Sequence, residues 1–492
     1  MITAGPIPSV SYQKELPPAQ GLPLLAVGVQ RGAPPSSPVA GIPEAEELLR
    51  RGDFLGESGE RALLYPAGGP ERLLLLGLGD GDPSLDTFRR WAARAVAEAR
   101  GVRVQQAVLF LPKAAGDGRK ATTAAAQGAV LGSRLSWKEE KLPALKRIVL
   151  TGEESEESGA SAAREGAVLA EAAFFARQLA MEPANHLPPA ALAAEASRIA
   201  EESGAAIRIL DEKELEKEGL AAIVAVGSGS VNPPRLIELV YDGSGGAGPT
   251  VALVGKGVTF DSGGLSLKPA DRMVHMKYDM SGAAAVLAAI RGAARLALPI
   301  RVAAIVPSAE NMPGPHSYRP GDVISSYKKV TVEVDNTDAE GRLLLADALA
   351  WTEERLRPEV MIDIATLTGA CKIALGRHAA GLFASDDDLA AALVDAGSES
   401  GDRLWRLPLW DSYDKELESD VADLKNVGRA AVGGGAAVAA RFLARFVERT
   451  PWAHVDIAGV AWSDGKRDLG PAGSTGFGAA VLLGYLVRKA RS

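Results

Sequence analysis

The chain has 492 residues, of which 47% are hydrophobic and 24% are charged, and its formal net charge is −8. This balance is typical of a globular protein and excludes disorder as the dominant state, because enough apolar surface exists to offset the ordering entropy. The first 20 residues lack the pattern of a signal peptide, and no run reaches the ~18 apolar residues of a membrane span. A single cysteine, Cys371, excludes intramolecular disulfides and cysteine-based metal clusters. We expect a cytoplasmic protein of two or three domains without a membrane partner.

Charge is distributed unevenly along the chain. Residues 1–150 hold 19 basic and 15 acidic side chains, a balance of +4, whereas the remaining residues hold 35 and 47, a balance of −12. A solvated acidic surface is the ordinary explanation of such an excess. The sharper interpretation is that some of these carboxylates converge on cations.

The first 150 residues predict a small α/β domain with one clear helix and several apolar strands. In chain order the predicted elements are strands 22–29 and 72–78, helix 85–99, and strands 105–111 and 146–150. The acidic, turn-rich segment 152–158 predicts a domain boundary. A long Ala-rich helix predicted over 161–181 ends before Pro183, and we interpret it as a connector between domains.

From about residue 184 onward, helical and strand patterns alternate. The predicted elements are helix 192–203, strands 205–210, 236–241 and 250–254, helix 281–296, strands 300–306 and 330–334, and helices 342–355 and 436–449. Strands without polar alternation suit a sheet covered on both faces, with the functional site at the strand ends. We therefore predict an α/β fold with a smaller N-terminal α/β domain (1–155), a linker helix (156–183), and a C-terminal domain (184–492) whose mixed central sheet is flanked by helices.

Three segments place charged residues inside apolar, Gly-rich sequence. They are GKGVTFDSGGLSLKP at 255–269, MKYDMSGA at 276–283 and NTDAEGRL at 336–343. Their candidate functional side chains are Lys256, Asp261, Lys268, Asp279, Asp338, Glu340 and Arg342. In an extended chain, alternate residues point the same way, so the last three would share one face.

Each segment also has a purely structural interpretation. Asp279 could cap the helix that begins near Ser281, and the pair Gly263–Gly264 could mark a turn. The D-x-E-x-R pattern of 338–342 could be an exposed strand. Taken singly, each segment favours the structural interpretation, but all three lie at the ends of strands that are predicted to be buried.

Convergence of the four carboxylates would need cations. Like charges in one place repel and raise one another's pKa, and an all-oxygen ligand set suits Mg²⁺, Mn²⁺ or Zn²⁺. Two divalent ions would neutralise four carboxylates, and Lys256 could then act as a ligand only in its neutral form. A histidine site is not supported, because no HExxH motif occurs in the sequence.

These three segments resemble the signature segments of the leucyl (cytosol) aminopeptidase family of two-metal peptidases, NTDAEGRL most specifically. The resemblance covers roughly residues 170–490, and the N-terminal part matches in architecture only. Further similar segments are ARQLAMEPANHLPP (176–189), ENMPGPHSYRPGDVI (310–324), IDIATLTGAC (362–371), LPLWDSYDKELESDVADLKN (407–426) and WAHVDIAGVAW (452–462).

The resemblance implies a role for each matching residue of the C-terminal, catalytic domain. Lys256, Asp261, Asp279 and Glu340 match the ligands of one metal, and Asp261, Asp338 and Glu340 match those of the other. Lys268 and Arg342 match the catalytic positions, and the family places a bicarbonate ion on this arginine as a general base. The substrate-binding wall corresponds to Met276, Thr366, Leu367 and Gly369.

The resemblance also implies a mechanism and an assembly. Two Mn²⁺ or Zn²⁺ ions ~3.5–4 Å apart would hold a hydroxide that attacks the peptide bond. One ion would bind the free α-amine, so that only N-terminal residues, Leu among others, are removed. Lys268 would donate to the developing oxyanion. The family forms homohexamers, and we expect one here.

Two alternatives remain. Another two-metal hydrolase, such as a phosphatase or nuclease, would share the carboxylates but would have no obvious use for Lys256 as a neutral ligand. Some relatives also bind DNA, but this sequence has no dense basic run with interleaved aromatic residues, which disfavours a nucleic-acid partner. The run Gly77–Gly81 after a strand fails the G-x-G-x-x-G spacing and is better explained as a strand-to-helix turn.

Overall fold

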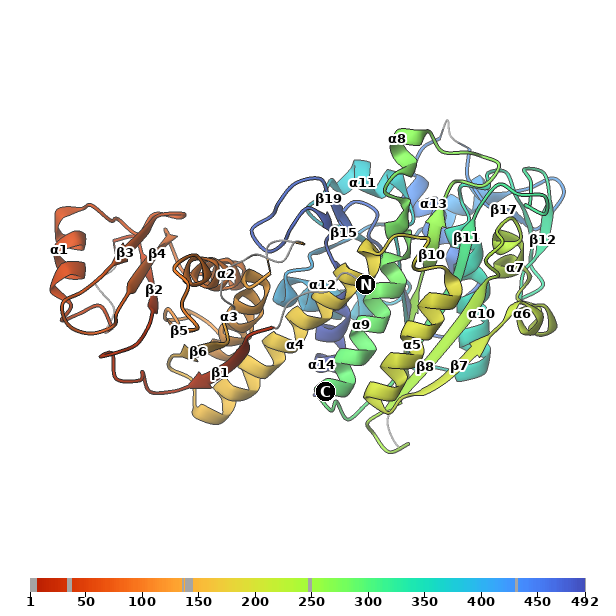
Figure 1. Cartoon of the computed structure of the whole chain (residues 1–492). Helices are drawn as coiled ribbons and strands as arrows, with labels where there is room; N and C mark the ends of the chain where they lie inside the picture. The colour runs from red at the N-terminus through yellow and green to blue at the C-terminus, as the bar shows by residue number, and fades with distance from the viewer. Residues whose placement is uncertain are drawn as a thin grey trace. The chain divides into compact units, whose positions relative to one another are not determined.

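The computed structural model describes residues 7–32, 38–134, 137, 145–246, 250–429 and 432–491 (Figure 1). It contains two compact units. Unit 1 comprises Ala172–Ser463 and Gly473–Ser492, and unit 2 comprises Ile2–Glu171 and Asp464–Ala472. The 26-residue helix α4 (Glu156–Met181) contributes to both units. No helix in the described ranges is long and apolar enough to cross a membrane.

Unit 2 is built on a six-stranded sheet of order β1-β6-β5-β2-β4-β3. All neighbouring strands are parallel except β3, which is antiparallel to β4. The strands are β1 Ser9–Gln13, β2 Leu25–Gln30, β3 Arg61–Leu64, β4 Leu73–Gly79, β5 Gln106–Phe110 and β6 Arg147–Thr151, and the helices are α1 Pro43–Arg51, α2 Leu85–Gly101 and α3 Gly118–Gly132.

Local sequence explains how unit 2 packs. The four leucines 73–76 of β4 are buried, as expected of a strand covered on both faces. Helix α2 is capped by Ser84, whose hydroxyl accepts a hydrogen bond from the Thr87 backbone N–H. Helix α3 lies so close to α2 that a Cβ atom on Gly128 would approach the Arg89 carbonyl oxygen to 1.9 Å, so glycine is required there.

Unit 1 is built on a nine-stranded mixed sheet. Its order is β16-β15-β18-β14-β9-β11-β8-β7, and β10 pairs in parallel with β11. Strands β18, β14, β9 and β11 are mutually parallel, so their carboxyl ends share one edge. The strands are β7 Ala206–Leu210, β8 Arg235–Asp242, β9 Thr250–Gly255, β10 Gly257–Asp261, β11 Arg301–Asn311, β14 Val360–Ala365, β15 Ala380–Ala384, β16 Leu404–Arg406 and β18 Trp452–Asp456.

Helices cover both faces of this sheet. Helices α9 and α10 both pack against β9, β11 and β14, from opposite faces (Figure 1). The helices are α5 Pro189–Ser203, α6 Glu212–Glu218, α7 Ala221–Gly227, α8 Ala270–Met273, α9 Ser281–Arg295, α10 Gly341–Leu356, α11 Gly369–Leu375, α12 Asp387–Ser400, α13 Gly435–Ala444 and α14 Ala479–Lys489, with 3-10 turns η1 Met276–Met280 and η2 Asp411–Leu417. Two small sheets complete the unit, one of β12 Val323–Ser325, β13 Thr331–Glu333 and β17 Leu424–Lys425, and one of β19 Trp462–Ser463 and β20 Gly473–Ser474.

The structure confirms the predicted α/β class, the N-terminal α/β part and the mixed C-terminal sheet flanked by helices. The helix predicted over 436–449 is shorter, because α13 ends at Ala444 and the chain turns toward β18. The helices α1, α3, α6, α7, α8, α11, α12 and α14 were not predicted. Most residues of α3 and α14 are buried, so their sequences lack the one-sided apolar pattern that marks a surface helix.

Candidate metal centre

Polar residues gather at the carboxyl edge of the four parallel strands of unit 1. Lys256 follows β9, Asn311 ends β11, Thr366 follows β14 and Asp456 ends β18. These positions face the region that α/β sheets commonly use for ligands. The prediction that the site lies at the strand ends matches this arrangement.

Asp261, the last residue of β10, is fixed by two hydrogen bonds. Its Oδ1 atom accepts one from the Asn311 side-chain amide at 2.9 Å and one from the Gly263 backbone N–H at 2.8 Å. Its Oδ2 atom lies 2.7 Å from Lys268 Nζ. The carboxylate is therefore held in one orientation at the strand end.

The Gly263–Gly264 pair forms a turn, as the structural interpretation predicted. Both residues have positive φ angles, 86° and 63°, which a side chain disfavours. A Cβ atom on Gly263 would also lie 2.5 Å from the Ser266 carbonyl oxygen. The turn thus reverses the direction of the chain, and Lys268 lies beside the carboxylates of Asp261 and Asp338.

The interpretation of Asp279 as a helix cap is wrong. The N-cap position of α9 is Met280, and Asp279 lies in the preceding 3-10 turn η1. Its Oδ1 atom accepts a hydrogen bond from Thr366 Oγ1 at 2.7 Å, and its Oδ2 atom lies 2.8 Å from Lys256 Nζ. The carboxylate is buried and belongs to the polar cluster.

The extended geometry expected for 338–342 is also wrong. Glu340 has helical dihedrals, φ −71° and ψ −37°, and α10 begins at Gly341, so Arg342 lies in the first helical turn. A Cβ atom on Gly341 would lie 2.6 Å from Lys256 Cε, and the glycine therefore gives the lysine room. Asp338 and Glu340 join the cluster, whereas Arg342 Nη1 donates to the Asn426 carbonyl oxygen at 2.6 Å.

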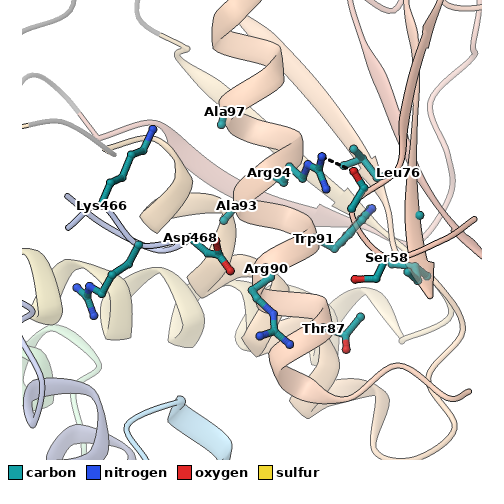
Figure 2. A pocket seen from close by; sticks show the side chains of 14 residues that line it. Ser58, Leu76, Thr87, Arg90, Trp91, Ala93, Arg94, Ala97, Lys466 and Asp468 are labelled. Atoms are coloured by element: carbon teal, nitrogen blue, oxygen red, sulfur yellow. Dashed lines mark hydrogen bonds between the residues drawn. The ribbon is translucent and has the colours of Figure 1, made fainter. Parts of the chain in front are cut away.

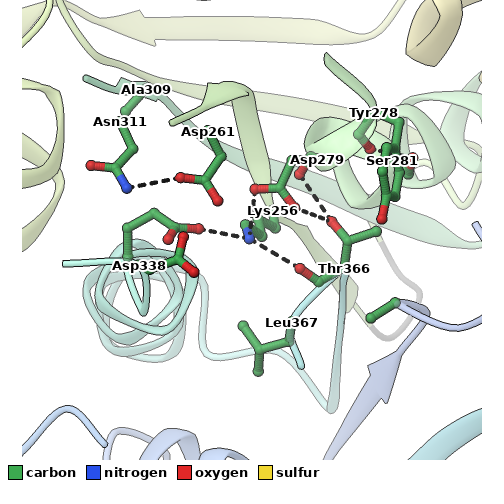
Figure 3. A network of polar contacts seen from close by, with 12 residues as sticks. Lys256, Asp261, Tyr278, Asp279, Ser281, Ala309, Asn311, Asp338, Thr366 and Leu367 are labelled. Atoms are coloured by element: carbon green, nitrogen blue, oxygen red, sulfur yellow. Dashed lines mark hydrogen bonds and ion pairs between the residues drawn. The ribbon is translucent and has the colours of Figure 1, made fainter. Parts of the chain in front are cut away.

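The structure thus brings together two lysines and four carboxylates. Figure 3 shows Lys256 among Asp261, Asp279 and Asp338. Lys256 Nζ lies 2.8 Å from both Asp279 and Glu340 and donates to the Thr366 carbonyl oxygen at 3.0 Å. Lys268 Nζ contacts Asp261 and Asp338. One oxygen from each of Asp261, Asp338 and Glu340 lies within 4.8 Å of the others, which is close enough for all three to share a metal ion.

Burial and mutual repulsion govern the charge states of the carboxylates. Burial raises the pKa of Asp261 well above its ordinary value, and Glu340 and Asp279 raise it further. Burial also raises the pKa of Asp279, to about 6, although Lys256 opposes the effect. Burial would raise the pKa of Glu340, but Lys256 and Lys268 together lower it below the usual range.

For the lysines, burial acts on the pKa in the opposite direction. Burial lowers the pKa of Lys256, but Asp279, Glu340 and Asp261 outweigh it, and the pKa is raised overall. The pKa of Lys268 is raised in the same way, by Asp261 and Glu340 against burial. Both ammonium groups therefore act as cations among the carboxylates.

The residues present fit divalent cations. Two ammonium groups leave two of the four carboxylate charges unbalanced, and Glu340 Oε2 is buried with no hydrogen-bond partner among the described residues. Such an oxygen is costly to leave without a partner, and carboxylate donors suit hard divalent ions. The donor set therefore fits a metal centre.

Arg342 lies beside this centre as a buried cation. Burial lowers the pKa of its guanidinium to about 10, and Nε has no hydrogen-bond partner within the described ranges. An unsatisfied buried N–H group favours an acceptor, and an anion would satisfy both its charge and its hydrogen bond.

The residues expected to form the substrate wall come from two segments, the 3-10 turn η1 and the loop between β14 and α11. Met276 begins η1, three residues before Asp279. Thr366 bonds to Asp279, the backbone N–H of Leu367 donates to Asp456 Oδ1 at 3.3 Å, and the exposed Gly369 begins α11.

Sequence reasoning missed two supporting residues. Asn311 is fully buried and orients Asp261 while donating also to the Thr337 carbonyl oxygen at 3.0 Å. Asp456 is fully buried and accepts hydrogen bonds from the Thr368 hydroxyl at 2.6 Å and from the Leu367 backbone. A polar residue at the carboxyl end of an otherwise buried strand is the signal that could have found both.

A mixed α/β unit with a largely buried carboxylate and lysine cluster at its strand ends is the arrangement expected of a metal-dependent enzyme. The catalytic-domain model of the cytosol aminopeptidase family matches residues 174–483, and the N-terminal-domain model of that family matches residues 41–137. The chain belongs to the cytosol aminopeptidase family. It is a metal-dependent aminopeptidase that acts on the N-terminal residues of peptides.

Similar proteins cover nearly the whole chain. A probable cytosol aminopeptidase of Roseiflexus castenholzii is 44% identical over 451 residues, covering 89% of this chain and 92% of its own length. One of Nitrosococcus oceani is 42% identical over 486 residues, with 95% and 96% covered. Among solved structures, a mutant of tomato leucine aminopeptidase matches with TM-score 0.86 at 32% identity, covering 99% and 97%. The bottromycin maturation enzyme BotP in complex with Mn matches with TM-score 0.85 at 37% identity, covering 96% and 100%.

Proposed function

We propose that the four carboxylates, together with Lys256 once metal binding has displaced its proton, hold two divalent ions, Mn²⁺ or Zn²⁺, and that this pair drives removal of N-terminal residues, Leu among them. The observation that carries the proposal is the approach of Asp261, Asp338 and Glu340 to within 4.8 Å, with Asp279 joined to them through Lys256. Asp261 and Glu340 would contact both ions. A structure of a similar protein, BotP, is described in complex with Mn, which supports the choice of metal.

Divalent ions at such a site lower the pKa of water and polarise the scissile carbonyl. The chain's own residues supply the rest. Asn311 and Gly263 hold Asp261 in place, and Thr366 holds Asp279, so the donor set is organised before any substrate binds. Organisation of this kind keeps the reorganisation cost out of the chemical step.

Lys268 is placed to stabilise charge that develops during the reaction. It is half-buried at the margin of the cluster and its raised pKa keeps it protonated. A protonated amine at this position can donate to the oxyanion of the tetrahedral intermediate. Because that charge is absent from the ground state, its stabilisation raises kcat.

Arg342 is the residue proposed to bind a bicarbonate ion. Its Nη1 is fixed by the Asn426 carbonyl oxygen, while its Nε is buried without a partner among the described residues. A planar anion of this kind pairs well with a guanidinium and can accept a proton as a general base. Met276, Thr366, Leu367 and Gly369 form the proposed wall that receives the N-terminal side chain.

A pair of substrates tests the proposed function. Leucine amide and N-acetyl-leucine amide differ only in the free α-amine, and we expect hydrolysis of the first alone. Activity should disappear after exhaustive chelation and return with Mn²⁺ or Zn²⁺. Equal turnover of the two substrates, or full activity at negligible metal content, contradicts the proposal.

Three organisational expectations accompany it. We infer a homohexamer in the cytoplasm and the division into 1–155, 156–183 and 184–492. Light scattering on the purified chain should give six times the chain mass, and limited proteolysis should cut first near residues 152–158.

A further inference from the structure

Unit 2 contains a pocket that the peptidase chemistry does not use. It has a volume of about 690 Å³, within the range of small-molecule sites, and its walls come from β4, α2 and the segment 464–472 (Figure 2). On α2 the lining residues Thr87, Arg90, Arg94 and Ala97 are spaced three or four apart, and Trp91 is next to Arg90, so they form one stripe along the helix.

The pocket is strongly basic. Arg90, Arg94, Lys466 and Arg467 line it against a single carboxylate, Asp468, in a chain whose net charge is −8. Arg90, Arg94 and Lys466 form no ion pair with any carboxylate of the described part of the chain. Surface cations elsewhere in this unit are commonly paired, as Arg61 is with Glu98. Several unpaired cations facing one cavity attract a multiply charged anion.

A second observation points to a ligand with an acceptor group. Trp91 is 4% exposed, lines the pocket, and its indole N–H has no hydrogen-bond partner among the described residues. A buried donor without an acceptor is costly, and a bound acceptor would remove that cost. Leu76, Leu78 and Ala93 provide an apolar wall beside it.

The glycine run of this pocket does not bind the anion itself. The backbone N–H groups of Gly77 and Gly79 donate to the carbonyl oxygens of Glu60 and Gly56. A Cβ atom on Gly77 would lie 1.9 Å from the Glu57 carbonyl oxygen, so this glycine serves the close approach of two backbone segments. Recognition must therefore come from side chains, chiefly the guanidinium groups, which pair well with phosphate oxygens.

We propose that this pocket binds a small phosphate-bearing molecule whose remaining part is apolar. A doubly charged phosphate matches the unpaired cations better than a single carboxylate does, and the leucine and alanine wall accepts an apolar group. The same cations could contact the phosphates of nucleic acid, but a cavity of about 690 Å³ lined by β4, α2 and the 464–472 segment has the size of a small-molecule site.

The test is isothermal titration of the full-length, metal-loaded protein with phenyl phosphate, with benzyl alcohol as the uncharged comparison. We expect saturable binding of one phenyl phosphate per chain and none of benzyl alcohol. The double variant Arg90→Gln/Lys466→Gln should weaken binding by about tenfold or more, and Trp91→Phe by a smaller factor. The matched control Arg103→Gln/Lys113→Gln removes two exposed charges of unit 2 that do not line the pocket, and its affinity should stay within about twofold of the parent's.

Several results would overturn the proposal. One is the absence of saturable binding up to about 10 mM. Another is equal weakening by the control variant, which would mean unspecific attraction. Binding that survives Arg90→Gln/Lys466→Gln unchanged would belong to another site, such as the metal centre. Binding of a DNA duplex that depends on Arg90 and Lys466, without binding of phenyl phosphate, would assign the surface to nucleic acid.

Discussion

The candidate metal centre of unit 1 and the basic pocket of unit 2 use charge in opposite ways. In the candidate metal centre, carboxylates alternate with lysines, and further backbone or side-chain donors fix Asp261 and Asp279. In the pocket, Arg90 and Lys466 are exposed and unpaired with any carboxylate of the described residues. Buried charges without partners are costly, whereas exposed ones cost little and stay available for a ligand. A preorganised centre for chemistry and an open site for binding therefore differ in how far the protein balances its own charges.

The largest expected effect is the loss of Glu340. Its carboxylate lies 2.8 Å from Lys256 and within 4.8 Å of Asp261 and Asp338. Because it is the proposed ligand of both ions, Glu340→Ala should abolish metal binding as well as activity. Metal content after dialysis, measured by mass spectrometry, checks this. A variant that keeps its full metal content would show that Glu340 is not a ligand.

The loss of Lys268 should affect rate and leave the metals in place. As a donor to transition-state charge, its removal should cost on the order of 10²–10³ in kcat, as in comparable oxyanion sites. The comparison with Glu340→Ala separates the two roles. If Lys268→Ala instead loses its metals, the lysine is a ligand or a structural residue.

A third variant tests a buried carboxylate outside the cluster. Asp347, on α10, accepts hydrogen bonds from the backbone N–H groups of Ala222, Ile223 and Tyr327. Burial raises its pKa to about 7, above that of an unfolded chain. Its contribution to stability is therefore greatest in acid and is lost as the pH rises from ~4 toward 7.

The measurement is the free energy of unfolding in urea. Asp347→Asn leaves one N–H group poorly paired and should cost ~1–3 kcal/mol at acidic pH. That cost should shrink as the pH rises toward neutrality, while the exposed control Asp388→Asn shows no such trend. A cost that grows with pH would mean that the three N–H donors outweigh burial and keep Asp347 ionised.

The smallest expected effect concerns the pocket variants. Arg90→Gln/Lys466→Gln touches no residue of the metal centre, so kcat/KM for leucine amide without added phosphate should stay close to the parent's. A large fall in basal activity would show that these cations serve catalysis.

Much of the candidate metal centre could be predicted from the sequence, because its lysines and carboxylates lie in three short segments. Even there, the local backbone geometry was predicted wrongly. Residues 338–342 were expected to be extended, but α10 begins at Gly341. Asp279 was interpreted as a helix cap, but Met280 is the N-cap residue of α9. Asn311 was not predicted as a site residue, because a single asparagine at a strand end forms no recognisable motif. The pocket was not predicted at all, because its α2 residues and Lys466 lie in distant parts of the chain and only the fold brings them together.

The central claim is that the carboxylate cluster holds the metal ions that drive peptide hydrolysis. The most direct test is calorimetric titration of chelated wild-type protein and of Glu340→Ala with Mn²⁺, with leucine amide hydrolysis measured at each step. We predict two ions per wild-type chain, activity that returns as they bind, and neither binding nor activity in the variant. Binding of the two ions by Glu340→Ala with unchanged affinity, or wild-type activity before any ion binds, would contradict the account.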